Sequence, residues 1–296
     1  MGCQVSCRLN AAAPVYMATA VCVLIRGGIS AKSSDYENSI QDGHICCQGS
    51  VSCLAELYNL CHIPFSDILS ARGGCITMTI LEAIDARHSV RAYLDKPIDP
   101  ETRRRLDEFL AGCNQESGLN IFIRYDDPDG FDSRLAHYGS FRNVRNYIVL
   151  SGKKSDDFDY LCGYFGEKIV LFAQQLGLNT CWAALTFNKK KVRELIPAGE
   201  TLCMVIALGY GETQGVNRKS KSAQDVADGG ADQPWFGRGI EAALKAPTAV
   251  NQQKFLFSLK DGSPYVRVKG LGAYAKVDLG IVACHFEAAS GKKVLH

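Results

Sequence analysis

The sequence lacks a strong excess of either charge. Its 33 Lys and Arg residues almost balance its 31 Asp and Glu residues, which leaves a formal net charge of +2 and a sequence pI near 7.9. No basic run is interleaved with aromatic residues in the way that single-strand nucleic-acid binders require. Nucleic acid is therefore not an expected partner, and any anion-binding site must be local.

Long apolar runs are also scarce. The run at residues 11–25 is interrupted by Pro14 and preceded by Arg8, and it is shorter than the roughly 20 apolar residues that a membrane span needs. It is compatible with the hydrophobic region of a signal peptide or with a short anchor. For residues 78–296 we expect no membrane association and a cytoplasmic location.

Paired cysteine spacings are missing, although the chain has 13 cysteines. Eight precede Met78, and the remaining five are typical of reduced thiols in a cytosolic fold. These five are Cys113, Cys162, Cys181, Cys203 and Cys284. Among residues 44–62 several Cys and His side chains are potential zinc ligands, but no Cys-x-x-Cys pair occurs there. We therefore expect no metal site.

Residues 1–77 differ in character from the rest, because a Ser-, Gly- and Asp-rich segment at residues 27–43 follows the apolar run. We expect a Cys-rich, poorly ordered N-terminal extension here. Two alternatives stay open. The stretch is either an upstream segment outside the working protein, or a metal-binding or membrane-tethering region that defines what the protein does.

From Met78 onward the pattern is that of an ordinary α/β domain. Thr79 and Glu82 have the capping-box spacing, and Asp99-Pro100 is a helix start that predicts a helix to about Cys113. The pattern further predicts strands at 120–125 and 147–150, a helix at 157–176 that ends at Gly177, and a central strand at 202–209.

The last part of the chain repeats this order. A polar connection at 211–232 precedes a helix at 240–245, two strands at 254–259 and 265–268, and a helix at 278–289. The repetition indicates two pseudo-symmetric halves, at about 78–215 and 237–296, joined by a linker at about 211–236. We predict an α/β (α+β) fold of three layers, α/β/α, with a mixed and mainly antiparallel sheet.

Four stretches carry groups suited to an anionic, heteroaromatic ligand. Residues 87–91 hold two guanidiniums and a hydroxyl, which match a phosphate, and residues 218–221 supply further cations. Residues 177–184 read as a small-residue loop with exposed backbone N–H groups. Residues 246–253 read as a helix end rich in side-chain amides.

Together these stretches resemble the FMN-dependent nitroreductase superfamily. Residues 87–91, Arg-His-Ser-Val-Arg, resemble its Arg-x-Ser-x-Arg phosphate motif, and residues 177–182 resemble its Gly-Leu-Gly-x-x-Trp loop with Asn179 in place of the second glycine. Leu208-Gly209-Tyr210-Gly211 is similar to its Leu-Gly-Tyr-Pro strand end. Residues 246–253 are similar to its Ala-Pro-Ser-x-x-Asn-x-Gln motif, although Lys254-Phe255 replaces the usual Pro-Trp.

The resemblance implies a flavoprotein that uses FMN and either NADH or NADPH to reduce nitroaromatic, quinone or similar small-molecule acceptors in a ping-pong reaction. It implies no catalytic side chain, because the flavin carries the chemistry. Replacing Arg87 and Arg91 by alanine should weaken FMN binding and leave the fold intact. The implied cofactor-binding residues are Arg87, His88, Ser89, Arg91, Thr180, Cys181, Trp182, Ala183, Arg218, Lys219, Pro247, Thr248, Asn251 and Gln253.

One departure from the family pattern concerns the order of the motifs. The Ala-Pro-Thr-x-x-Asn motif follows the first arginines by about 155 residues, whereas ordinary members carry it soon after them and contribute it from the opposite subunit. This arrangement is similar to the TM nitroreductase branch. We expect one chain to supply both sides of one FMN site and to be monomeric. The alternative is a flavin-binding protein without turnover, which serves in binding or sensing.

Three further features have simpler interpretations. We expect His285, on an apolar helix face, to be a packing residue. Residues 189–191, three lysines after Asn188, are most simply a solvated face, with attraction of a dinucleotide phosphate as the alternative. Cys181 is expected to be a small packing residue, because nothing near it in the sequence would lower its pKa.

Overall fold

The computed structural model describes residues 78–133, 138–230 and 232–296. Residues Ile76–His296 form one compact unit, and the expectations for residues 1–77 lie outside the described residues. Within the described part of the chain, no helix is both long enough and apolar enough to cross a membrane.

The first two described helices begin where their capping residues predict. Helix α4 (Ile80–Ala86) starts at Thr79, whose backbone N–H donates to the Glu82 carboxylate at 2.7 Å while its hydroxyl caps the helix in return. Helix α5 (Pro100–Ser117) starts at Asp99, which accepts from the backbone N–H of Thr102 at 3.0 Å. It continues to Ser117, four residues beyond the expected end, and Gly118 ends it with a left-handed φ of 69°.

The first half then forms a four-stranded antiparallel sheet in the order β1-β2-β4-β3. Its strands are β1 (Asn120–Arg124), β2 (Asn146–Gly152), β3 (Asn179–Ala183) and β4 (Thr201–Gly209). Short helical segments η2 (Pro128–Gly130) and α8 (Lys189–Arg193) and the long helix α7 (Phe158–Gln175) connect them. Strand β4 lies inside the sheet, as predicted from its continuous apolar sequence.

The prediction of a loop at residues 177–184 is wrong. Residues 179–183 form the edge strand β3, whose Thr180 is paired with Leu208 of β4. On its other side, the backbone N–H of Val90 donates to the carbonyl of Thr180 at 3.0 Å. Gly177, with a φ of 78°, ends α7 just before this strand. The turn signal in the sequence is therefore correct only for the first residues of the stretch 177–184.

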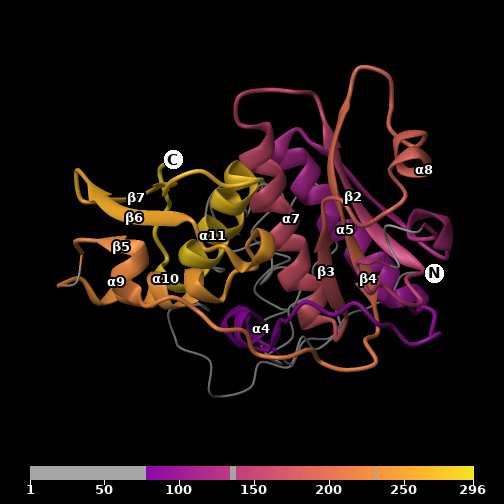
Figure 1. Cartoon of the computed structure of the whole chain (residues 1–296), viewed down its shortest axis with the longest axis horizontal. Helices are drawn as coiled ribbons and strands as arrows, with labels where there is room; N and C mark the ends of the chain where they lie inside the picture. Colours follow the sequence, from indigo (N-terminus) through magenta and orange to yellow (C-terminus); the bar gives the residue numbers. More distant parts are fainter. Residues whose placement is uncertain (1–77, 134–137, 231) are drawn as a thin grey trace, which may run out of the picture. The chain divides into compact units, whose positions relative to one another are not determined.

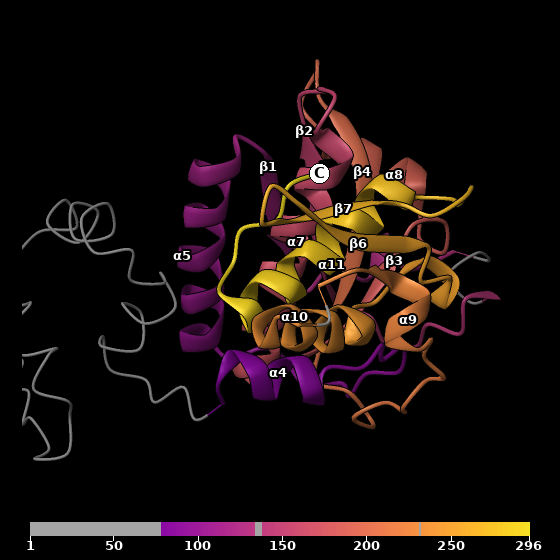
Figure 2. The ribbon, with the colours of Figure 1, turned by 90° about the vertical axis from the view of Figure 1, so that its left-hand side faces the viewer.

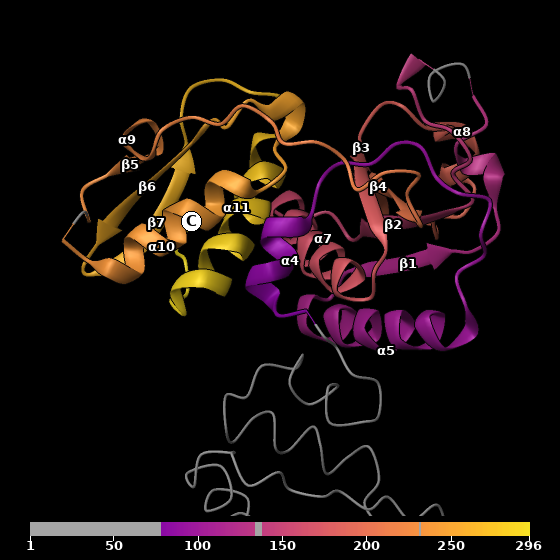
Figure 3. The same ribbon diagram turned by 90° about the horizontal axis from the view of Figure 1, so that it is seen from below.

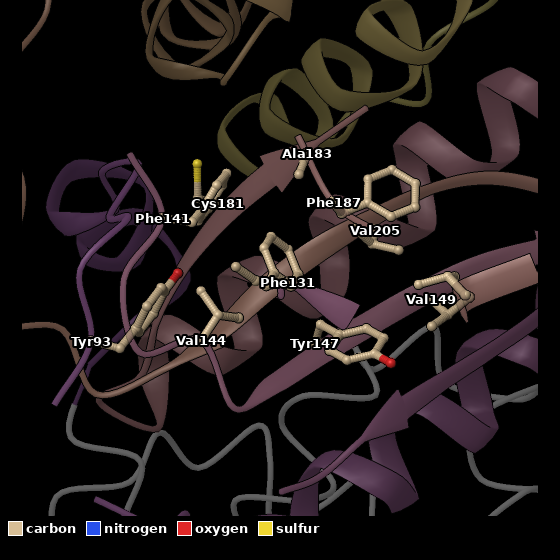
Figure 4. Close-up of a cluster of buried hydrophobic side chains, with 12 residues drawn as sticks. Tyr93, Phe131, Phe141, Val144, Tyr147, Val149, Cys181, Ala183, Phe187 and Val205 are labelled. Atoms are coloured by element: carbon tan, nitrogen blue, oxygen red, sulfur yellow. The ribbon is translucent and has the colours of Figure 1, made fainter. Parts of the chain in front are cut away.

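One face of this sheet is covered by a cluster of buried aromatic and aliphatic side chains from the loops that connect the strands. Phe131, Phe141 and Phe187 pack there on Tyr147 and Val205 of the strands, and Cys181 lies at the Tyr93 and Phe141 end of the cluster (Figure 4). The opposite face packs against α7, where a Cβ at Gly166 would lie within 3.2 Å of both Trp182 and Leu150. Both faces of the sheet are therefore buried, as the uniform burial of β2 indicates.

The second half repeats the order of the first, as the sequence predicts. Helix α10 (Pro234–Lys245), strands β6 (Phe255–Lys260) and β7 (Ser263–Val268) and helix α11 (Ala275–Ser290) correspond in order to α5, β1, β2 and α7 (Figure 1). In both halves the two strands pair antiparallel. Helix α10 begins six residues before the predicted start, with Pro234 in its first turn.

The strands of the second half form a sheet of their own. Short strand β5 (Ala227–Asp228) pairs parallel with β6, which gives the order β5-β6-β7. Strand β5 and helix α9 (Ala223–Val226) lie within the connection expected at 211–232, which is therefore partly structured. The expected mixed and mainly antiparallel sheet is thus divided over two sheets, one for each half, with α9 and β6 close together in Figure 2.

The two halves meet where α7 crosses α11, with α4 beside them (Figure 3). Glycine makes this crossing possible. A Cβ on Gly163 of α7 would lie 2.1 Å from the carbonyl oxygen of Val277, and a Cβ on Gly280 of α11 would lie 2.0 Å from that of Tyr160. The two backbones approach so closely that no other residue fits at either position.

Candidate functional site

The segment after α4 is held between two parts of the sheet. In addition to the Val90–Thr180 hydrogen bond, Leu94 donates its backbone N–H to the carbonyl of Tyr210 at 2.8 Å, just beyond β4. Asn179 then fastens the start of the 211–232 connection, because its Oδ1 accepts the backbone N–H of Gly211 at 3.0 Å. Its side-chain N–H donates to Gln214 at 2.9 Å. These contacts bring residues 87–91, β3 and the connection together.

The connection in turn binds the amide-rich segment of the second half. The side-chain N–H of Asn251 donates to the carbonyl of Lys219 at 2.8 Å, and Gln253 Oε1 accepts the backbone N–H of Lys221 at 2.8 Å. Gln253 Nε2 also donates to Ser220 Oγ at 2.9 Å. The structure therefore brings together all four stretches that the sequence singles out, from both halves of one chain.

Two guanidiniums meet at the C-terminal end of α10. Arg87 Nη2 donates to the carbonyl of Lys245 at 3.1 Å, and Arg218 Nη2 donates to the carbonyl of Ala246 at 2.5 Å. The last carbonyls of a helix have no partner within the helix, and the helix dipole is negative at this end. The end of α10 thus stabilises two neighbouring cations.

These cations affect each other and their neighbours. Burial first and the charge of Arg87 second lower the pKa of Arg218 to about 10, and burial lowers the pKa of Arg87. The pKa of His88 is also lowered, by burial and then by Arg87 and Arg218. Burial is the first cause for all three groups, and neighbouring positive charge adds to it at Arg218 and His88. A bound anion would relieve this repulsion.

The two arginines of the first motif lie in different surroundings. Arg87 is 4% exposed, and its Nε lies 3.6 Å from Glu167 Oε1. That Nε is buried and has no hydrogen-bond partner among the described residues. Arg91 is exposed, with its guanidinium 6.0 Å from the centre of the Phe141 ring. Ser89, between them, is exposed.

The predicted site residues of β3 are mostly buried. Thr180, Cys181 and Ala183 are each about 2% exposed. Burial raises the pKa of the Cys181 thiol, which agrees with a packing role. The indole N–H of Trp182 donates to Glu167 Oε2 at 2.8 Å, so its side chain points toward α7.

The segment after α10 is strained and tightly held. Val250, Asn251 and Gln253 have positive φ values of 46°, 55° and 44°, and the β-branched side chain of Val250 is 97% exposed. Thr248 Oγ1 accepts the backbone N–H of Gln253 at 3.0 Å, and Asp278 of α11 accepts the backbone N–H of Ala249 at 2.9 Å. Non-glycine residues rarely adopt such angles, and residues held in them are found more often at functional sites than elsewhere.

The two amides of this segment differ in what they can still bind. Gln253 uses its carbonyl and its N–H groups within the chain, on Lys221, Ser220 and Leu244. Asn251 Oδ1 is buried and lacks a hydrogen-bond partner among the residues that the structure describes. Pro247 and Thr248 are buried, whereas Lys219 is exposed. Asn251 is thus the amide that remains able to bind a ligand.

Sequence reasoning missed Glu167 and Asp278, which organise the site. Glu167 is fully buried and contacts Arg87, Trp182 and His285. The sequence carries a signal for Glu167, because it is surrounded by apolar residues along α7. Burying a carboxylate there costs free energy unless the carboxylate is paired. His285 is buried with a partner for each ring nitrogen, in line with a packing role.

Comparison with known proteins identifies the family of this chain. Residues 79–290 match the family described as "Putative TM nitroreductase", and the chain therefore belongs to this family. A search of curated proteins found no match.

One solved structure supports the fold, and two others have lower TM-scores. A Thermotoga maritima protein described as a putative nitroreductase superposes with a TM-score of 0.52 and 23% identity, covering 72% of this chain and 83% of that one. The FMN-dependent nitroreductase of Clostridium difficile has a TM-score of 0.39 and 20% identity, over 49% and 94% of the two chains. A Desulfovibrio desulfuricans protein described as a putative nitroreductase in complex with FMN has a TM-score of 0.40 and 19% identity, over 50% and 94% of the two chains.

Proposed function

We propose that the chain binds FMN where residues 87–91, β3, residues 218–221 and residues 246–253 meet, and that it is an FMN-dependent NAD(P)H oxidoreductase of nitroreductase type. Nitroaromatic compounds, quinones or similar small molecules are its acceptors. Membership of the nitroreductase family supports this assignment. When bound, FMN supplies the redox chemistry, by accepting a hydride from NADH or NADPH and passing electrons to the acceptor.

The groups at the end of α10 fit the phosphate of FMN. Arg87 lies close enough to Arg218 to lower its pKa, and Glu167 is the carboxylate that acts on both guanidiniums. The Arg87 Nε, buried without a hydrogen-bond partner in the described part of the chain, is a donor of the kind that a phosphate oxygen accepts. Arg91, Ser89 and Lys219 are exposed and add donors at the edge of this site.

Asn251 fits the polar rim of the isoalloxazine ring. Its buried Oδ1 has no hydrogen-bond partner among the described residues, and ring N–H groups of a flavin need an acceptor. The hydrogen bond from its side-chain N–H to Lys219 fixes its orientation. Gln253, in contrast, holds the segment in shape rather than binding the ring itself.

The observation that carries the proposal is the convergence of the four motif segments within a single chain. The test is the absorption spectrum of purified protein after FMN is added and unbound FMN is removed by gel filtration. We expect a retained yellow flavin. A colourless protein would contradict the proposal.

A flavin-binding protein without turnover remains the second candidate, because Lys254-Phe255 stands where the family pattern has Pro-Trp. Anaerobic mixing with NADH and, separately, NADPH distinguishes the two candidates. Rapid bleaching of the bound flavin, followed by recolouring with a quinone, supports the oxidoreductase. A flavin that stays oxidised with both nucleotides supports the binding protein.

A further inference from the structure

Behind Arg87 lies a fully buried contact between a histidine and a carboxylate. His285 Nε2 is 2.8 Å from Glu167 Oε1, and both side chains are 0% exposed. His285 Nδ1 is 3.1 Å from the carbonyl oxygen of Ala242. Glu167 Oε2 accepts the indole N–H of Trp182 at 2.8 Å.

These distances determine the number of protons in the pair. A carbonyl oxygen can only accept, so Nδ1 of His285 must carry a hydrogen. If the ring is otherwise neutral, Nε2 has a lone pair and the carboxyl of Glu167 must donate to it. If Glu167 is ionised, Nε2 must donate instead, and the ring is an imidazolium. Both arrangements hold one proton more than a neutral histidine beside a carboxylate, and both have zero net charge.

We propose that Glu167 and His285 share one buried proton and act as positioning residues that set the charge available at Arg87 for the FMN phosphate. While the proton is present the pair is neutral, and the charge of Arg87 is left for the phosphate. When the proton leaves, Glu167 becomes a full counter-charge 3.6 Å from Arg87 Nε. This inference rests on the proposed function and names what regulates binding at that site.

The charged groups around the pair agree with this role. Arg87 from the end of α4 and Arg218 from the 211–232 connection are the cations that act on Glu167. Cys284 of α11 also faces Glu167, and burial raises the pKa of its thiol so that it stays neutral. Burial lowers the pKa of His285, although its hydrogen bond to Glu167 acts in the opposite direction.

Linkage gives the sign of the effect. A phosphate beside Arg87 favours the protonated pair, so FMN binding takes up a proton and its affinity falls as the pH rises past the pH at which the pair loses its proton. One proton changes the affinity by at most about tenfold per pH unit. Above pH 7 the FMN phosphate is fully charged, since its second pKa is about 6, and the lowered pKa of His88 makes that ring neutral.

The first measurement concerns the full-length protein without flavin. Nitrogen-15 NMR of His285 reports which ring nitrogens carry hydrogen, and a titration from pH 6 to 10 reports where the shared proton leaves. We expect Nδ1 to carry a hydrogen while the shared proton is present and the ring nitrogen signals to change when that proton leaves. A His285 ring whose Nε2 signals stay constant up to pH 10 would overturn the proposal, because no proton would be released.

The second measurement compares the dissociation constants of FMN and riboflavin across the pH range in which His285 titrates. We expect FMN affinity to fall by up to about tenfold per pH unit and riboflavin affinity to stay constant, because riboflavin has no phosphate. The matched variant is Glu167→Gln. Its amide can donate to His285 Nε2 and accept from Trp182, so it keeps both contacts and removes the shared proton. FMN binding to this variant should lose the pH dependence.

The outcomes separate the proposal from the function on which it rests. FMN affinity that does not change while His285 titrates would overturn the coupling and leave the flavin site standing. No FMN binding at any pH would overturn the flavin site and the coupling together. If Glu167→Gln fails to fold, the comparison of FMN with riboflavin in the unaltered protein still decides whether FMN affinity depends on the shared proton.

Discussion

Arg87 and Arg91 are four positions apart in one motif, yet they have different roles in the structure. Arg87 is buried against Glu167 and the end of α10, whereas Arg91 is exposed. A charge buried with a partner is costly to unpair, whereas an exposed arginine contributes little to stability. The expectation that both can be replaced without harm to the fold therefore has to change for Arg87.

We predict different effects for the two single variants. Arg91→Ala should change the free energy of unfolding by less than about 0.5 kcal/mol and weaken FMN binding about tenfold. Arg87→Ala should lower the free energy of unfolding by about 3 kcal/mol, because Glu167 and the carbonyl of Lys245 lose a buried contact partner. Urea unfolding and FMN titration measure both effects. Arg104→Ala on α5, which removes only exposed ion pairs, is the control and should leave FMN binding unchanged.

Asp278 gives a pH-dependent prediction. Burial raises its pKa to about 6, although hydrogen bonds from Gln252 and Ala249 act in the opposite direction. Its pKa in the unfolded chain is about 3.9. The neutral carboxyl therefore contributes stability that is complete below pH 4 and is lost as the pH rises through 6, by about 3 kcal/mol.

The variant Asp278→Asn tests this prediction by urea unfolding at pH 4, 6 and 8. The variant should be more stable than the unaltered protein at pH 8, because no charge has to be buried, and the difference should shrink toward pH 4. A stability difference that is the same at all three pH values would show that Asp278 titrates normally in the folded protein.

At the scale of elements, the crossing of α7 and α11 decides how the two halves meet. Both helices are apolar on most sides, with buried residues along nearly their whole length. Their backbones touch at Gly163 and Gly280. Glu167 and His285, which face each other across these helices, lie close to this crossing. The geometry of the crossing therefore positions the groups behind the proposed phosphate site.

Substitutions at three glycines test the importance of this crossing. Gly163→Ala and Gly280→Ala should each lower the free energy of unfolding by about 3 kcal/mol or more, because the added methyl group would meet a backbone carbonyl that cannot move aside. Gly237→Ala in α10 is the matched control, since nothing lies within 4 Å of its Cβ position. It should stabilise the protein by about 0.8 kcal/mol, from helix propensity alone. Thermal and urea unfolding measure all three, and a harmless Gly280→Ala would contradict the tight crossing.

At the scale of the whole chain, the two halves contribute complementary parts of one site. Residues 87–91 and β3 come from the first half, whereas Asn251 and the end of α10 come from the second. A single chain thus holds all the segments of the proposed site.

We predict one FMN per chain, bound by a monomer. Light scattering after gel filtration gives the mass of the species, and flavin absorbance gives the stoichiometry. One flavin per chain, retained on dilution, is the expected result because no second chain is needed. Two flavins per chain at saturation, or flavin lost as a dimer dissociates, would contradict it.

Local signals predicted most of the elements. The caps at Thr79 and Asp99, the stop at Gly177 and the apolar run of β4 all place structure correctly, because they act through backbone hydrogen bonds and burial within a few residues. Strand β3 was not predicted, because its pairing with β4 and Val90 depends on distant parts of the chain.

The four candidate stretches could be identified from the sequence because guanidiniums, amides and glycines are recognisable by type and spacing. Glu167 could not be placed in the site, since its partners Arg87, Trp182 and His285 come from three other elements. Whether Asn251 or Gln253 remains able to bind a ligand also depends on contacts that only the folded chain makes.

The sequence by itself determined the family and most of the elements, and it singled out the segments that we propose for the site, because these depend on local chemistry. Only the tertiary structure decided which arginine is buried, which amide remains able to bind a ligand and where Glu167 and His285 meet. The reason is that burial and partnership are properties of surfaces brought together from distant positions. Arg87 and Arg91 have the same side chain, and the crossing of α7 and α11 gives only one of them a buried carboxylate.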